Sequence, residues 1–139
     1  MPIITGPRKR HRATLAVVTA LIVIVLGLAL RFYGPGLGLP AFIVKYGGSI
    51  LWATMVYVLL VALLPSMSWR QIGGLALAVA VIVEASRLIH TPWLDSFRLT
   101  LAGALLLGRI FSLWNILAYA IGILIGICID GIAMRRASA

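Results

Sequence analysis

Residues 14–30 read TLAVVTALIVIVLGLAL, a run without a charged side chain. An α-helix rises 1.5 Å per residue, and about 17–25 apolar residues cross the hydrocarbon core of a bilayer. The run ends in front of RFYGPGLGLP, residues 31–40, whose glycines and prolines cannot continue a helix. The stretch therefore predicts a transmembrane helix, extending at most to Tyr33, followed by a loop.

Three more apolar runs follow. Residues 49–64 read SILWATMVYVLLVALL and stop at Pro65, a third run extends from residue 72 to about residue 89, and a fourth from about residue 113 to residue 132. The composition agrees, because 63% of the residues are hydrophobic and 11% are charged, whereas soluble domains carry about 25% charged residues. We expect an all-α polytopic membrane protein with four transmembrane helices, in which residues 14–132 form one domain between tails at 1–13 and 133–139.

Two apolar pieces are too short to span a bilayer. They are residues 42–46, which include Lys45, and TLAGALLLG at residues 100–108, which as a helix would be about 14 Å long. Each is predicted to be an interfacial or re-entrant half-helix, which is tolerated at membrane depth only where protein or water covers its ends.

Pairs of small residues four positions apart let helix backbones approach closely in membranes. Two such pairs lie in the third run, and one, a GxxxG unit, lies in the fourth. The residues predicted to pack helices are Gly74 with Ala78, Ala76 with Ala80, and Gly122 with Gly126.

The net charge of +9 comes from twelve Lys and Arg against three acidic residues. Half of the basic residues lie in the two tails: Arg8, Lys9, Arg10, Arg12, Arg135 and Arg136. No aromatic residue is interleaved with either cluster, so anionic membrane lipids are expected as partners and nucleic acid is not. An even number of spans puts both tails on one side, and the positive-inside rule predicts that this side is the cytoplasmic face of a bacterial inner membrane.

Cys128 is the one cysteine, so neither an intrachain disulfide nor a cysteine metal site is expected. The sequence contains no Ser-His-Asp arrangement, metal-ligand cluster, P-loop or haem motif. We therefore predict no catalytic residue, metal or cofactor.

One carboxylate interrupts the third run, in VIVEASRLIHTPWLD at residues 81–95. A charge at the bilayer centre costs about 2.5–3.5 kcal/mol on insertion scales, so Glu84 needs a partner, water or a function. Arg87 follows one helical turn later on the same face and can pair with it. Two interpretations stay open: a structural ion pair that fixes how the third helix packs, or a pair that faces a ligand or takes part in catalysis.

The fourth run carries its GxxxG glycines and its polar residues on one face. On a helical wheel, five residues fall within about 80° of one another: Asn115, Tyr119, Gly122, Gly126 and Asp130. Asn115, at the outer end, is expected to face Glu84. Asp130, at the inner end, is expected to be satisfied by water and by Arg135 and Arg136.

The segment HTPWLDSFR, residues 90–98, predicts a short helix between the third and fourth spans. Pro92 fits its first position and Thr91 its N-cap. Trp93 and Phe97 would then point toward the membrane interface, and Asp95 and Arg98 would lie three positions apart. His90 is interpreted as an interfacial histidine rather than a base.

Three blocks of the sequence resemble a family of small bacterial membrane proteins of unknown function, domain of unknown function 2809. They are RFYGPGLGLPAFIVKYGGSILWATMVYVLLVALLP at residues 31–65, VEASRLIHTPWLDSFR at 83–98 and GALLLGRIFSLWNILAYAIG at 103–122. The last two blocks are also similar to a VanZ-like pattern. VanZ-like proteins are associated with glycopeptide resistance at the cell envelope, so this similarity implies a compartment more than a reaction.

The chain departs from the family pattern at three positions. The pattern has an acidic residue where this chain has Ser49, glutamine in place of Arg87 and aspartate in place of Asn115. The positions that agree with the pattern are Glu84, His90, Trp93, Asp95, Arg98, Tyr119 and Gly122. The resemblance thus implies that two carboxylates are replaced by neutral groups and that a cation is gained beside Glu84.

The leading functional hypothesis is a non-enzymatic or unassigned envelope protein that binds an anionic lipid headgroup at its outer face. The residues proposed to bind it are Glu84, Arg87, His90, Asp95, Arg98, Arg109 and Asn115, since arginine suits bidentate phosphate contacts. The alternative is a structural accessory subunit of a larger membrane complex, or a homo-oligomer, with a degenerate family site. Weaker hypotheses are an enzyme with Glu84 as general base and a transporter.

Overall fold

The computed structural model describes residues 6–108 and 111–138. Four long helices account for most of the chain: α1 (Pro7–Tyr33), α2 (Ala41–Leu63), α3 (Trp69–Ser86) and α6 (Leu113–Ser138). A 3₁₀ turn, η1 (Pro35–Leu37), joins α1 to α2, and two short helices, α4 (Pro92–Arg98) and α5 (Leu101–Leu106), lie between α3 and α6. All four long helices are long and apolar enough to cross a membrane, which confirms the predicted all-α architecture.

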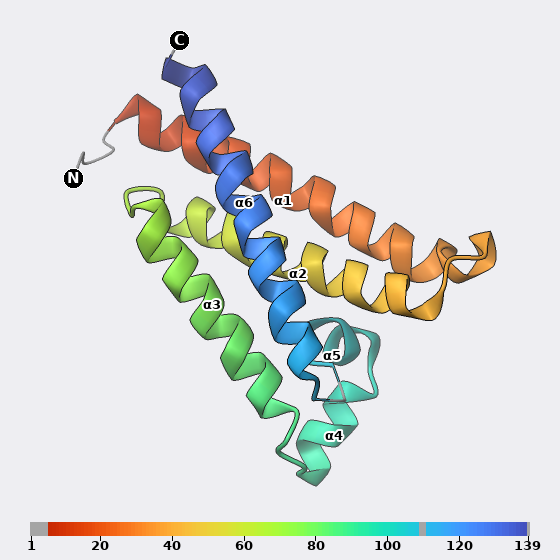
Figure 1. Ribbon diagram of the computed structural model, residues 1–139. Helices are drawn as coiled ribbons and strands as arrows, with labels where there is room; N and C mark the ends of the chain where they lie inside the picture. The colour runs from red at the N-terminus through yellow and green to blue at the C-terminus, as the bar shows by residue number, and fades with distance from the viewer. Residues whose placement is uncertain (1–5, 109–110, 139) are drawn as a thin grey trace.

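The long helices are arranged around α2, which packs against both α1 and α6, while α3 packs against α6 and α2. Figure 1 shows α1 and α2 side by side, with α4 and α5 beside the start of α6. The beginning of α1 and the end of α6 lie at the same end of the molecule (Figure 1). The helix bundle therefore has a tail end, where α1 begins and α6 ends, and an opposite end, where α4 and α5 lie.

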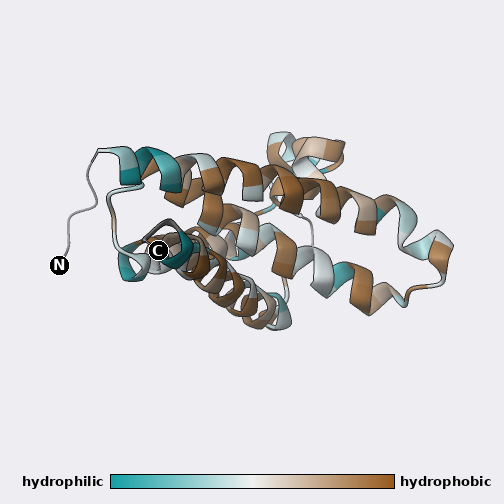
Figure 2. Ribbon diagram, turned by 90° about the horizontal axis from the view of Figure 1, so that it is seen from above, coloured by the Kyte–Doolittle hydropathy of each residue, from teal (hydrophilic) through white to brown (hydrophobic). Residues whose placement is uncertain are grey.

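Small and aromatic residues form the buried core between these helices. Ala53 and Tyr57 of α2, Ala76 of α3 and Tyr119 of α6 are almost completely inaccessible. Large apolar side chains such as Val25 and Ile82 are mostly exposed instead. Figure 2 shows that hydrophobic residues dominate the middle of the long helices, whereas hydrophilic residues gather where α1 begins and α6 ends. This distribution is what lipid around the middle of the helices requires.

The two predicted half-helices have different outcomes. Residues 100–108 do contain a short helix, α5, whose N-cap Thr100 accepts a hydrogen bond from the Gly103 amide at 3.1 Å. Residues 42–46 are not a separate piece, because they form the first turns of α2. The prediction was wrong because Gly47 and Gly48 do not interrupt the helix; a side chain at Gly47 would meet Leu30 of α1 at 3.0 Å.

Of the two small-residue pairs predicted in α3, one is buried in the core and the other is exposed. Ala76 and Ala80 are buried, whereas Gly74 and Ala78 are exposed, and no atom lies within 4 Å of a side chain built at Gly74. Packing by Gly74 and Ala78 is therefore not found within the described chain, because the face two residues further along turns toward the core. Gly122 and Gly126 of α6 do pack: side chains added there would strike the Ile50 carbonyl at Gly122 and the Tyr57 ring at Gly126.

Candidate functional site

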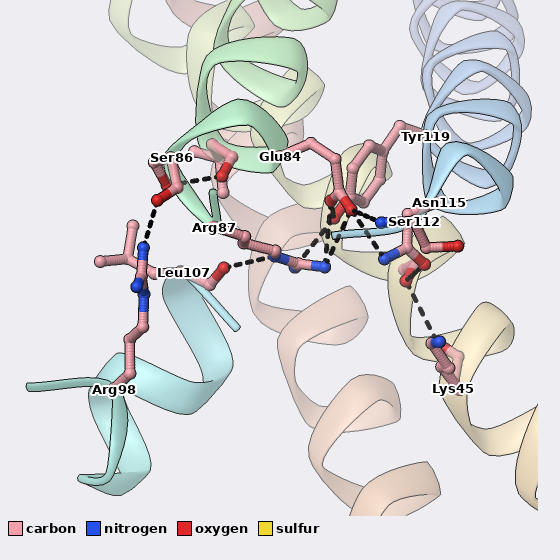
Figure 3. Close-up of polar contacts among 11 residues, drawn as sticks. Lys45, Glu84, Ser86, Arg87, Arg98, Leu107, Ser112, Asn115 and Tyr119 are labelled. Atoms are coloured by element: carbon pink, nitrogen blue, oxygen red, sulfur yellow. Dashed lines mark hydrogen bonds and ion pairs between the residues drawn. The ribbon is translucent and has the colours of Figure 1, made fainter. Parts of the chain in front are cut away.

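Glu84 lies at the centre of a buried polar cluster at the α4–α5 end of the molecule. Its side chain has no accessible surface. The Ser112 amide donates to Oε1 at 2.7 Å, and the Asn115 Nδ2 donates to the same oxygen at 3.2 Å. The Tyr119 hydroxyl donates to Oε2 at 2.8 Å. These donors come from α6 and from the residue just before it, so they attach α6 to the end of α3 (Figure 3).

Arg87 completes the cluster from the same helix as Glu84. Its Nη1 lies 3.0 Å from Glu84 Oε2, which confirms the predicted ion pair. Its Nη2 donates to the Tyr119 hydroxyl at 3.0 Å, and its Nε donates to the Leu107 carbonyl at 2.7 Å. Arg87 therefore connects the carboxylate to the end of α5 as well as to α6 (Figure 3).

Gly108 makes room for this guanidinium. Its φ is +69°, in the left-handed region that costs residues with a side chain about 1–2 kcal/mol. A Cβ at this position would stand 2.5 Å from Arg87 Nη2. A glycine is therefore required here for two reasons, one conformational and one steric.

Asn115 extends the cluster to α2. The Ser49 hydroxyl donates to Asn115 Oδ1 at 3.2 Å. On the same side, the Trp52 ring packs against the Tyr119 ring with centroids 5.2 Å apart. The predicted approach of Asn115 to Glu84 is confirmed, and three of the long helices meet at this cluster.

The geometry leaves Glu84 with no free acceptor site. An ionised carboxylate offers about four lone pairs, and the chain's own amide, hydroxyl and guanidinium groups occupy both oxygens. A general base needs hydrogen-bond access to the proton that it removes. In this arrangement the carboxylate joins segments of the chain, and no substrate can approach it without displacing one of these donors.

Arg98, in the last turn of α4, is buried against the end of α3. It donates to the Ile89 carbonyl at 2.7 Å, to the Ser86 carbonyl and to Asp95 Oδ1 at 3.1 Å. The last carbonyls of a helix lack partners within it and carry partial negative charge, so a cation there is favourable. Arg98 thus caps the α3 terminus and also pairs with Asp95, three positions before it in the sequence.

The other predicted residues of this end lie at its surface or outside the described part. His90 Nδ1 is 3.4 Å from Asp95 Oδ1, and both side chains are largely exposed. Thr91 occupies the N-cap position of α4, but its hydroxyl makes no capping bond and is buried without a partner among the described residues. Trp93 and Phe97 are exposed, and their position at the membrane interface stays a prediction. Arg109 lies outside the described residues.

A second buried cluster lies at the opposite end, and its centre is the Arg12–Asp130 ion pair. Arg12 Nε and Nη2 contact the two carboxylate oxygens of Asp130 at 2.9 and 2.6 Å. Arg12 Nη1 donates to the carbonyls of Pro65 and Met67 at 2.8 and 2.7 Å, and the Tyr57 hydroxyl lies 3.3 Å from Asp130 Oδ2. The pair thus joins α1, α6 and the α2–α3 connection.

The prediction that Arg135 and Arg136 satisfy Asp130 was wrong. Both arginines are exposed, whereas Arg12, 118 positions away in the sequence, is buried beside Asp130. Local spacing cannot connect residues of the first and last helices. The sequence signal for this pair was that Arg12, just before the first apolar run, and Asp130, near the end of the fourth, are both predicted on the cytoplasmic side. Tyr119, by contrast, could be found, since it lies one turn from Asn115 on the predicted polar face.

The described residues contain no group of three or more His, Cys, Asp or Glu side chains able to hold a metal ion. All three acidic residues of the chain are in ion pairs with arginine: Glu84 with Arg87, Asp95 with Arg98 and Asp130 with Arg12. The site at the α4–α5 end is therefore a closed polar cluster.

A comparison with family models finds one described as protein of unknown function (DUF2809), which matches residues 38–123. The matched region begins just before α2 and ends inside α6, so it contains Glu84 and all of its hydrogen-bond donors. Arg12 and Asp130 lie outside it. No solved structure matches the chain.

Proposed function

The chain belongs to this family of proteins of unknown function (DUF2809), and we propose that it is a non-enzymatic, multi-pass structural subunit of a larger membrane complex in the bacterial cell envelope. Glu84 serves this role as a junction that fixes α3 against α6. The saturation of the buried Glu84 carboxylate by donors from its own chain supports the non-enzymatic part of the proposal.

A ligand-binding role for the same residues has less support. Arg87 and Arg98, the two described arginines of the outer set, donate to backbone carbonyls and carboxylates of the chain. A lipid phosphate at this end would have to compete with these acceptors. The exposed His90 and Asp95 carry no net attraction for an anion when the imidazole is neutral.

The orientation is part of the proposal. Arg8, Lys9, Arg10, Arg135 and Arg136 are exposed at the end where α1 begins and α6 ends. Short basic segments beside transmembrane helices favour the cytoplasmic side. The α4–α5 end would then face the outside of the inner membrane.

The surface of α3 that carries Gly74 and Ala78 is where we expect a helix of a partner protein to pack. Gly74 and Ala78 are exposed and lie four residues apart, the spacing that lets a second helix pack closely. Elsewhere the long helices expose many large apolar side chains, which could contact either lipid or a partner protein.

Site-specific photo-crosslinking in the native membrane tests the proposal. A photoreactive amino acid at Ala78 should yield a defined, near-stoichiometric protein adduct, whereas the matched position Val25, exposed on α1, should react mainly with lipid. Clean monomer at both positions, together with a monomer after extraction in mild detergent, would contradict a subunit role. An adduct between two copies of this chain would show a homo-oligomer and would contradict a role as a subunit of a larger complex.

A further inference from the structure

A groove lies between the first turns of α1 and the last turns of α6, next to the Arg12–Asp130 pair. Its volume is ≈ 840 Å³, within the range of small-molecule sites. The side chains of Arg8, His11 and Arg136 line it together with Leu15, Ile129 and Ile132. The groove therefore combines basic and hydrogen-bonding groups with apolar walls.

The described polar lining of the groove is basic: Arg8, His11 and Arg136. None of the described acidic residues lines it. Asp130, the acidic residue on this part of α6, is directed to Arg12 and the neighbouring small cavity instead. An anion in the groove would thus meet two guanidinium groups and an imidazole.

The position of the groove fits a lipid rather than a soluble anion. Its basic residues lie at the termini of α1 and α6, where membrane-spanning helices leave the hydrocarbon and phosphates are found. Leu15 and Ile129 lie further inside the same helices, in the direction that an acyl chain would take from the phosphate. Figure 1 shows these two helix ends as neighbours.

We propose that this groove binds one anionic phospholipid, with its phosphate at Arg8, His11 and Arg136 and an acyl chain along Leu15, Ile129 and Ile132. A zwitterionic lipid binds less well, because its ammonium group cancels the negative charge that the two arginines attract. This site is at the opposite end from the Glu84 cluster, and the inference does not rest on the subunit role.

Native mass spectrometry of the full chain provides the test, using a mixture of phosphatidylglycerol and phosphatidylcholine with the same acyl chains. The groove variant Arg8→Gln/Arg136→Gln is compared with Arg10→Gln/Arg135→Gln. The control pair removes the same charge from adjacent positions on the same helices, and neither of its arginines lines the groove.

The wild type and the control variant should retain phosphatidylglycerol in preference to phosphatidylcholine. The groove variant should lose at least about tenfold of that retention, because each arginine near anionic lipid contributes roughly fivefold. Thermal unfolding shows whether the double variant folds. If it does not, Arg136→Gln is compared with Arg135→Gln, and the expected loss of phosphatidylglycerol retention is then roughly fivefold. Equal losses in both variants, or no lipid preference in the wild type, would overturn the proposal.

A competition with soluble glycerol phosphate separates the two sources of a phosphate. Millimolar glycerol phosphate should leave the retained phosphatidylglycerol in place, because it lacks the acyl chain that contacts the apolar wall. Displacement at concentrations close to that of the lipid would show an anion site without lipid specificity and would overturn the assignment.

Discussion

The hydroxyl of Tyr119 on α6 donates to the carboxylate of Glu84 on α3 over 2.8 Å, and both side chains are buried. This contact joins two of the four long helices at a buried position near the end of α3, where an unpaired charge would be costly. Arg87 contacts both residues, so the three side chains form one unit.

Neutralising the carboxylate should destabilise the fold. Glu84→Gln leaves the Arg87 guanidinium without its counter-charge, and breaking a buried pair costs about 3–5 kcal/mol. Denaturation of the detergent-solubilised protein measures this loss. The control is Asp95→Asn, whose side chain is 47% exposed. Its loss should be smaller than that of Glu84→Gln, because water reaches this carboxylate and Arg98 keeps the Ile89 and Ser86 carbonyls as acceptors. Equal effects of the two substitutions would show that Glu84 is not a structural junction.

Arg87→Gln installs the residue that the family resemblance predicts at this position. We expect a loss of about 1–3 kcal/mol, because glutamine can keep a donor near Glu84 but leaves the Leu107 carbonyl or the Tyr119 hydroxyl short of one. Arg87→Ala should lose more. A wild-type midpoint for Arg87→Gln in the same denaturation experiment would mean that the arginine adds nothing beyond the family residue.

Gly108→Ala tests the packing of the α5–α6 connection on Arg87. The substitution should cost at least about 1–2 kcal/mol from the positive φ alone, with a further cost where the new Cβ meets the guanidinium. Gly74→Ala is the matched control, because that glycine is helical, exposed and has open space around it. It should be neutral or stabilise by up to about 1 kcal/mol. The reverse order of the two thermal midpoints would refute the geometry at Gly108.

The local part of the site could be predicted from the sequence, because helical periodicity determines it. Glu84 with Arg87 and Asp95 with Arg98 lie three residues apart, and the wheel of the fourth run places Asn115 on the face that meets Glu84. The family resemblance of the three blocks is confirmed on the same region. The four spans follow from their length and hydropathy.

The remaining contacts depend on tertiary structure. The Ser112 amide and the Leu107 carbonyl are backbone groups, which every residue carries and no sequence pattern distinguishes. The Arg12–Asp130 pair requires α1 to pack beside α6. The continuity of α2 through residues 42–46 depends on α1 covering Gly47.

The pair at the tail end should behave as a unit. Asp130→Asn leaves Arg12 buried without a counter-charge and should cost about 3–5 kcal/mol, whereas Arg12→Met/Asp130→Leu removes both charges and should recover much of that loss. Arg135→Gln should have no measurable effect, since that side chain is exposed. If Arg135→Gln destabilised the protein as much as Arg12→Met, the assigned partner of Asp130 would be wrong.

A double-mutant cycle on Glu84 and Tyr119 tests the central claim most directly. The free energy of unfolding in detergent is measured for the wild type, Glu84→Met, Tyr119→Phe and the double variant. A structural junction predicts a coupling energy of about 1.5–3 kcal/mol, the usual contribution of a hydrogen bond to a charged group. Additive losses, with a coupling energy near zero, would contradict the claim that Glu84 holds α3 to α6.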